Sequence, residues 1–212
     1  MMNIAIQANK ELLQQNPQKI ALDKVSCLPH ISLAMGCIQK KNISEIEILL
    51  KNITRENSIG VLSATCVCVQ KNSTGETVSV LQIENTYSLQ RLHEQLMQKL
   101  VPFFSYEVRA DMILGNGSVS KTTLLWIKNY PEKSSYGNYF PHITLGYGEI
   151  IITNIPIQFS VSKLALCHLG NHCTCKKVLA AVDLTTWFNH IKSSRPKNKL
   201  FQPDLIRIFP FL

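Results

Sequence analysis

The sequence predicts an α+β fold built on antiparallel strand pairs. Runs rich in β-branched residues outnumber helical ones and are mixed with them along the chain, which is typical of this class. The expected hairpins are 59–69 with 78–83 across the polar connector 71–76, and 158–168 with 173–184 across a turn at 169–171. Between the two hairpins, residues 88–103 place leucines on one face and polar residues on the other, as in an amphipathic helix.

The remaining elements follow from shorter patterns. Residues 2–8 are expected to form a first strand, and residues 9–15 a helical turn that ends before Pro17. Residues 43–53 have apolar residues at helical spacing, although their isoleucines lower the helix propensity. We expect residues 1–184 to form the main domain, and residues 185–212 to be a C-terminal extension with a helix near 187–191 and a basic stretch at 193–199.

The bulk composition is that of a globular protein. Of the 212 residues, 45% are apolar and 17% are charged, which suits one large domain or two small lobes that share a core. The formal charge of +8 favours a polyanionic partner such as a nucleotide or RNA. The chain shows no secretory signal, no apolar run long enough for a membrane span and no regular cysteine framework, so we expect a cytoplasmic protein with reduced thiols.

One eight-residue sequence occurs twice. Residues 29–36 read PHISLAMG, and residues 141–148 read PHITLGYG. Proline, histidine, isoleucine, leucine and the final glycine match in register, and serine corresponds to threonine. The two copies lie too far apart for a solenoid repeat, which indicates two related halves that each contribute one copy.

The spacing of the repeat predicts a shared site. Residues two apart on a strand point to the same face, so His30 and Ser32 would share a face, as would His142 and Thr144. If the two strands lie side by side, two imidazoles and two hydroxyls converge on one groove. The glycines that close the motifs, Gly36 and Gly148, are expected to let the backbone turn or approach a ligand closely.

Two histidines suit metal-free cleavage of a phosphodiester. A neutral imidazole removes a proton from the attacking oxygen, while an imidazolium donates one to the departing oxygen. Histidine serves both roles because its ordinary pKa of about 6.5 lies near neutral pH. The hydroxyls of Ser32 and Thr144 would donate hydrogen bonds to the non-bridging phosphate oxygens.

The paired H-x-[ST] motifs resemble those of the 2H phosphoesterase superfamily, in particular the LigT-like RNA 2′,3′-cyclic phosphodiesterases of the 2′-5′ RNA ligase family. Residues 89–96 are similar to the helix that joins the two motifs in that family, and the resemblance covers roughly residues 24–184. It implies a bilobal sandwich of two pseudo-symmetric antiparallel-sheet lobes around a central groove, with no cofactor and no metal. The chain departs from the family in its short segment before the first motif. It also has Gly146, Tyr147 and Gly148 where some members carry a basic residue, so ligase-type contacts are not expected.

Several other residues carry alternative interpretations. Tyr136, Tyr139 and Tyr147 are candidates to stack on a nucleobase, although a tyrosine-rich surface loop would give the same pattern before the second motif. His93 is interpreted as structural packing within its helix. The rival metal site would use Cys167, His168, His172, Cys173 and Cys175. Its spacing is not that of a familiar zinc knuckle, and we interpret these cysteines, together with Cys66 and Cys68, as small buried hydrophobic residues.

The sequence therefore predicts a phosphoesterase that hydrolyses 2′,3′-cyclic nucleotides or RNA-terminal phosphodiesters. Its expected partner is a nucleotide or short single-stranded RNA, with no membrane and no obligate protein partner. The alternatives are a phosphodiesterase of 2′-5′-linked or cyclic oligonucleotide signals, a non-catalytic nucleotide- or RNA-binding module, and a zinc-stabilised interaction protein. The residues do not assign the acid and base roles between the two histidines.

Overall fold

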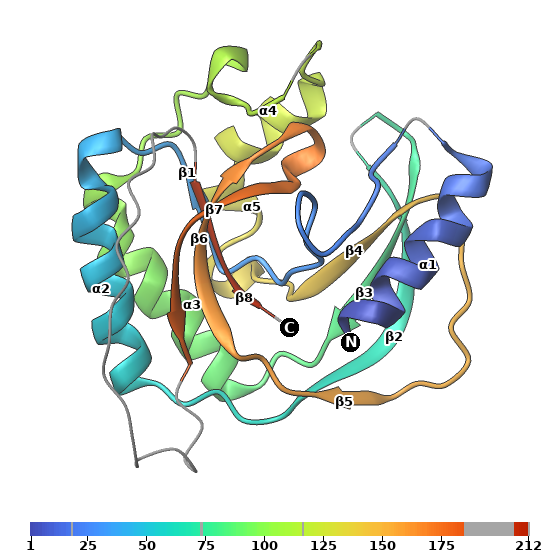
Figure 1. Cartoon of the computed structure of the whole chain (residues 1–212), viewed down its shortest axis with the longest axis horizontal. Coiled ribbons are helices and arrows are strands. Elements are labelled where there is room, and N and C mark those ends of the chain that lie inside the picture. Colours follow the sequence, from blue (N-terminus) through green and yellow to red (C-terminus); the bar gives the residue numbers. More distant parts are fainter. Residues whose placement is uncertain (18, 73, 116, 185–205, 212) are drawn as a thin grey trace.

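Two four-stranded antiparallel sheets, with helices packed outside them, make up the fold (Figure 1). The computed structural model describes residues 1–17, 19–72, 74–115, 117–184 and 206–211. The predicted α+β class and its antiparallel strand pairs are confirmed. Within these ranges no helix is both long and apolar enough to cross a lipid bilayer.

The described elements follow one another in mixed order. The α-helices are α1 (Met2–Gln15), α2 (Ile43–Glu56), α3 (Tyr87–Leu100), α4 (Lys121–Lys128) and α5 (Tyr130–Lys133). The strands are β1 (Ala34–Gly36), β2 (Leu62–Lys71), β3 (Thr77–Ile83), β4 (His142–Tyr147), β5 (Ile157–Phe159), β6 (Lys163–Leu169), β7 (Cys175–Asp183) and β8 (Ile206–Phe211). The predicted helices at 43–53 and 88–103 correspond to α2 and α3, and the predicted hairpins to β2–β3 and β6–β7.

The first sheet has the strand order β1-β8-β6-β7. Helix α2 packs against β7 and β6, and α3 lies beside α2 and contacts β1, so both cover this sheet (Figure 1). Strand β8 was not predicted. It lies inside the sheet, where its backbone pairs with β1 on one side and β6 on the other. The helix expected near 187–191 and the basic stretch at 193–199 lie outside the described residues.

The second sheet has the order β4-β3-β2-β5. The sequence predicted residues 158–168 as one strand, but the structure divides them between β5, which pairs with β2, and β6 in the other sheet. A register shift interrupts the β3–β4 pairing: Val80 is opposite Thr144, whereas Ser79 is opposite Gly146. This bulge adds one residue to β4 and reverses the alternation of its side chains beyond Thr144.

The prediction of a strand at residues 2–8 was wrong, because these residues belong to helix α1. Ala5, Ala8 and Leu12 are buried at intervals of three and four residues, and this helical stripe runs through the point where a break was predicted. Helix α1 packs its buried side against β4 (Figure 1). The strand that carries the second motif is thus supported from outside the sheet by the N-terminal helix.

The motif glycines serve packing inside the protein. A Cβ added at Gly36 would lie 2.7 Å from the Phe104 ring. At Gly148 the backbone φ is +110°, and an added Cβ would lie 3.2 Å from both Leu12 and Asn16 of the N-terminal segment. The expectation that these glycines admit a ligand is corrected, because protein side chains occupy the space beside them. Gly148 does have the turn conformation that was expected.

Asn9 connects α1 to the second motif. Its side chain is buried, and its Nδ2 donates to the carbonyls of Ile20 (2.8 Å) and Leu145 (2.7 Å). Its Oδ1 accepts from the backbone N–H of Leu22 at 2.7 Å. One amide therefore satisfies three backbone groups of two separate segments.

The substitution Asn9→Ala is expected to lower the free energy of unfolding by about 2–3 kcal/mol, because three buried backbone groups lose their partner. Urea denaturation at neutral pH measures this change. Asn3→Ala on the exposed side of the same helix is the matched control and should change the stability by less than about 0.5 kcal/mol. Equal stabilities of the two variants would contradict the role given to Asn9.

Candidate active site

The two copies of the repeated motif lie directly beside each other. Ile31 forms an antiparallel bridge with Ile143, the central residue of the second copy. Because the strands run in opposite directions, His30 is beside Thr144 and Ser32 is beside His142. The isoleucines are fully buried, and the four polar side chains on the alternate positions are partly exposed. The side-by-side arrangement expected from the spacing is therefore present.

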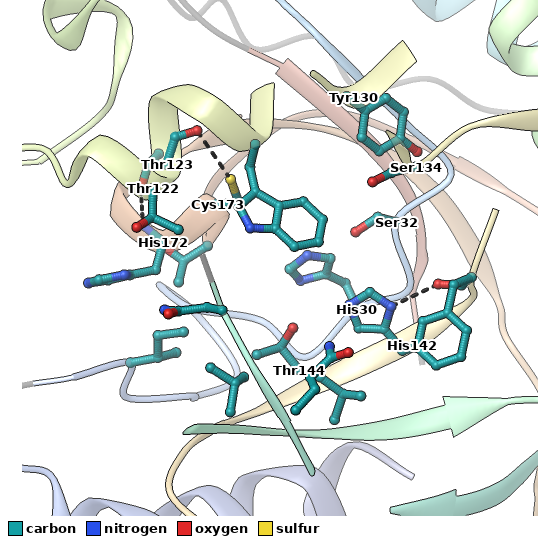
Figure 2. Close-up of a pocket in the computed structure, with 18 of the residues that line it drawn as sticks. His30, Ser32, Thr122, Thr123, Tyr130, Ser134, His142, Thr144, His172 and Cys173 are labelled. Atoms are coloured by element: carbon teal, nitrogen blue, oxygen red, sulfur yellow. Dashed lines mark hydrogen bonds between the residues drawn. The ribbon is translucent and has the colours of Figure 1, made fainter. Parts of the chain in front are cut away.

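All four polar motif residues line one cavity with a volume of about 430 Å³. Figure 2 shows the imidazoles of His30 and His142 close together, with Ser32 and Thr144 on either side of them. Neither histidine is buried in an apolar core, so both are accessible to a ligand in the cavity.

Each motif holds its imidazole in the same way. The Nδ1 of His30 is 2.7 Å from the carbonyl oxygen of Leu28, and the Nδ1 of His142 is 2.8 Å from that of Phe140. A carbonyl can only accept, so Nδ1 carries a proton and donates it in both rings. In the neutral form the basic lone pair is then on Nε2. Each histidine is thus prepared to exchange a proton through Nε2, with its tautomer set by the residue two positions earlier.

The charges of the cavity wall favour an anion. Its charged and titratable lining residues include His30, His142, His172, Lys71 and Lys133, whereas none of the described lining residues is an aspartate or glutamate. The absence of carboxylates among these residues removes the repulsion that a phosphate would otherwise meet. A carboxylate-rich site for a hard divalent cation is not formed here.

The three tyrosines proposed to stack on a base occupy different positions. Tyr139 and Tyr147 line the cavity, whereas Tyr136 does not. Tyr139 is buried and stacks face to face on His93, with ring centroids 4.0 Å apart. Tyr147 is also buried, and the Nζ of Lys19 lies 4.7 Å from its ring centroid. Each of these two rings therefore already has a protein group against one face.

His93 links the two motifs from α3. Its ring is fully buried, its Nδ1 donates to the carbonyl of Leu33 at 2.6 Å, and its Nε2 accepts from the backbone N–H of Tyr136 at 2.8 Å. Burial, the largest effect, lowers the pKa of His93, which keeps the ring neutral as this bonding requires. The structural role predicted for His93 thus includes hydrogen bonds from the first motif to the loop before the second.

The cysteine and histidine cluster at 167–175 does not assemble into a metal site. Among the described residues no group of three or more histidine, cysteine or acidic side chains could hold a metal ion. His168 bonds to the carbonyl of Met112, and His172 bonds to the Tyr147 hydroxyl, so the two histidines are directed to different parts of the protein. Cys167, Cys173 and Cys175 are buried, as predicted.

The prediction of buried thiols was wrong for the other cysteine pair. Cys66 is exposed and Cys68 is partly exposed, and both thiols contact the side chain of Gln82 on the neighbouring strand β3. Their sulfur atoms lie 3.6 Å apart. They are outside the cavity of the motif histidines.

Sequence reasoning missed Trp126 and Asn72 as cavity residues, and it considered His172 only as a metal ligand. All three line the cavity. A tryptophan on a short helix and an asparagine in a hairpin loop carry no signal of their own, because their positions depend on long-range packing.

In comparisons with known proteins, no family model and no curated protein matches this chain.

Proposed function

We propose that this protein is a phosphodiesterase that uses His30 and His142 as a general acid–base pair and needs no metal. The observation that carries the proposal is the antiparallel bridge between Ile31 and Ile143, which brings both H-x-[ST] motifs to one cavity. The likeness of the motifs to those of the 2H phosphoesterases supports it further. On this proposal the two sheets are the two lobes of that fold, and the protein acts in the cytoplasm.

The proposed reaction needs two proton transfers. A neutral imidazole takes a proton from a water molecule as the water oxygen bonds to phosphorus. The bond from phosphorus to one ribose oxygen then breaks, and the second histidine, protonated at Nε2, gives its proton to that oxygen. The two histidines end with exchanged protonation states, and solvent restores them. Ser32 and Thr144 donate hydrogen bonds to the non-bridging oxygens, which gain charge in the transition state.

The proposed substrates are 2′,3′-cyclic nucleotides and the phosphodiester ends of short single-stranded RNA. In a cyclic phosphate the attacking and leaving oxygens can lie in line between two facing histidines. The cavity is of the size that encloses a small ligand, and a long duplex could not bring its phosphates between the motif side chains. The net charge of +8 supports an anionic ligand.

A substrate screen with and without EDTA tests the proposal. The panel contains 2′,3′-cyclic mononucleotides, 2′-5′-linked and cyclic oligonucleotides, single-stranded RNA ends and duplex DNA. We expect turnover of 2′,3′-cyclic nucleotides or RNA ends at equal rates with and without EDTA, little turnover of the duplex, and weaker substrate binding as the salt concentration rises. Tight nucleotide binding without turnover would indicate a binding module instead, and loss of activity in EDTA with recovery in zinc would contradict a metal-free site.

A further inference from the structure

The cavity has a second polar end, formed by His172 and Tyr147. His172 lies in a short 3₁₀ turn, Asn171–Cys173, with φ of +58°, and its backbone N–H donates to the Thr123 hydroxyl at 2.8 Å. Figure 2 shows His172 beside Thr122 and Thr123, on the other side of the displayed group from His30 and His142. All of these residues line the same cavity. The proposed catalytic mechanism does not use this end.

The groups behind this end are fixed by hydrogen bonds within the loop after β2. The Oδ1 of Asn72 accepts from the backbone N–H groups of Thr74 (3.0 Å) and Glu76 (2.9 Å), which fixes the orientation of its amide. The Nδ2 of Asn72 donates to the Glu76 carboxylate at 3.1 Å, and the nearby Asn72 amide acts to lower the pKa of Tyr147. Burial is the larger effect and raises the pKa of Tyr147 to about 12, so the phenol keeps its proton.

The hydrogen bond between Tyr147 and His172 assigns the proton on His172. The Tyr147 hydroxyl lies 2.8 Å from Nδ1 of His172. Tyr147 is buried, and Nδ1 of His172 is the acceptor within reach of its phenol proton, so the phenol donates to Nδ1 and the neutral ring carries its own proton on Nε2. Burial, the largest effect, lowers the pKa of His172 and keeps the ring neutral. No described residue is hydrogen-bonded to Nε2, which leaves one neutral N–H donor at this end of the cavity.

The wall between the two polar ends is largely apolar. Val80 is opposite Thr144 and Val78 is opposite Tyr147 in the β3–β4 pairing, so the two valines lie between the ends, and Leu22 and Trp126, which is 39% exposed, also line the cavity. A flat heterocycle buries its faces well against such a wall, whereas a second phosphate would lose solvation there. The cavity therefore combines an anion end, an apolar middle and, at the far end, the neutral N–H donor of His172.

We propose that the His172 end is a nucleobase-recognition subsite, in which Nε2–H donates to an acceptor atom on the heterocycle while the phosphodiester lies between His30 and His142. The acceptor is a carbonyl oxygen or an unprotonated ring nitrogen, because a donor group on the base would meet the N–H of the imidazole. Tyr147 acts as a positioning residue that sets the tautomer of His172. This inference rests on the proposed function, because the phosphate is assigned to the motif histidines.

Two substitutions separate this subsite from the catalytic pair. In His172→Asn the new side chain tolerates the left-handed backbone and can still bond to Tyr147, but it has no donor at the position of Nε2. Tyr147→Phe keeps the buried ring and removes only the hydroxyl. Tyr87→Phe, at an 81% exposed position that does not line the cavity, is the matched control. Thermal unfolding of each variant verifies that the fold is retained.

The experiment measures equilibrium binding of the four nucleoside 2′,3′-cyclic phosphates and of a base-free methyl riboside 2′,3′-cyclic phosphate. The measurements use the His30→Ala background to prevent turnover. We expect His172→Asn to weaken binding of at least one nucleotide about three- to tenfold, the effect of one lost hydrogen bond, and to leave the base-free ligand unchanged. Tyr147→Phe should shift binding in the same direction by a smaller factor, and Tyr87→Phe should have no effect. With His30 intact, His172→Asn should raise KM and leave kcat unchanged.

Two results would overturn the subsite. The first is that His172→Asn weakens binding of the base-free ligand as much as binding of the nucleotides. The second is that His172→Asn binds all four nucleotides as tightly as the protein with His172 intact. These results are distinct from a failure of the proposed function. Binding that depends on the base, without any hydrolysis, would refute the proposed phosphodiesterase function but support the nucleobase subsite. Hydrolysis with binding that does not depend on the base would support the function and refute the subsite.

Discussion

Replacing either His30 or His142 by Ala is expected to lower kcat for cyclic phosphate hydrolysis by about 10²- to 10⁴-fold, the usual cost of losing a positioned general acid or base. Each imidazole is partly exposed and lies at the cavity wall rather than in the apolar core, so the fold should survive the substitution. The measurement is steady-state hydrolysis of the best substrate from the screen. The double variant should be little worse than either single one, because the two residues act as a unit.

The pH dependence and the controls make this prediction specific. Activity should follow a bell-shaped profile, because one histidine must be neutral and the other protonated. Ser32→Ala and Thr144→Ala should have milder effects, since each removes a single hydrogen bond to the phosphate. His168→Gln is the matched control: His168 lies on β6 outside the cavity, and the glutamine amide can still donate to the carbonyl of Met112. Activity losses as large in His168→Gln as in His30→Ala would contradict the shared site.

The second large effect is expected on stability. His93→Ala should lower the free energy of unfolding by about 3–5 kcal/mol, because it leaves two buried backbone groups without a partner and creates a cavity beside Tyr139. The groups affected are the carbonyl of Leu33 and the N–H of Tyr136, so the first motif and the loop before the second motif are both disturbed. Urea denaturation measures the loss. Arg91→Ala, at an exposed position of the same helix, is the control and should be nearly neutral.

His93 also predicts a pH dependence of stability. Its pKa in the folded protein is lowered, chiefly by burial, from an unfolded value near 6.5. The unfolded chain therefore binds a proton at a higher pH than the folded protein does. Stability should be fully present above about pH 6.5 and decrease as the pH falls below that value. His172, whose pKa is also lowered, adds to the same trend. His93→Gln should flatten the decrease between pH 7 and pH 5; an unchanged slope would contradict the assignment.

The elements that the sequence predicted are those with strong local signals. The leucine stripe of α3 and the polar connector between β2 and β3 depend on short-range periodicity and turn chemistry, and both were predicted close to their observed bounds. The motif histidines were identifiable because the same eight-residue pattern occurs twice. Such a repeat does not depend on long-range packing, so it can be recognised from the sequence alone.

The elements that were missed depend on distant partners. Helix α1 was expected to begin as a strand because its isoleucines resemble a β-rich run, whereas burial of Ala5, Ala8 and Leu12 against β4 selects the helix. Strand β8 has partners far away in the sequence, β1 and β6, and its own residues do not specify that pairing. The bulge in β4 brings Tyr147 to the cavity that His142 and Thr144 line, although an unbroken strand would have placed it on the opposite face.

The sequence by itself determined the chemistry of one end of the cavity: two histidines and two hydroxyls, duplicated at matching positions. Only the tertiary structure placed the two copies side by side at Ile31 and Ile143 and brought His172 from the turn between β6 and β7 to the same cavity. The physical reason is the range of the interactions. Alternation along a strand is a property of a few neighbouring residues, whereas strand pairing, the bulge at Thr144 and the bond between Tyr147 and His172 join segments that are remote in the chain.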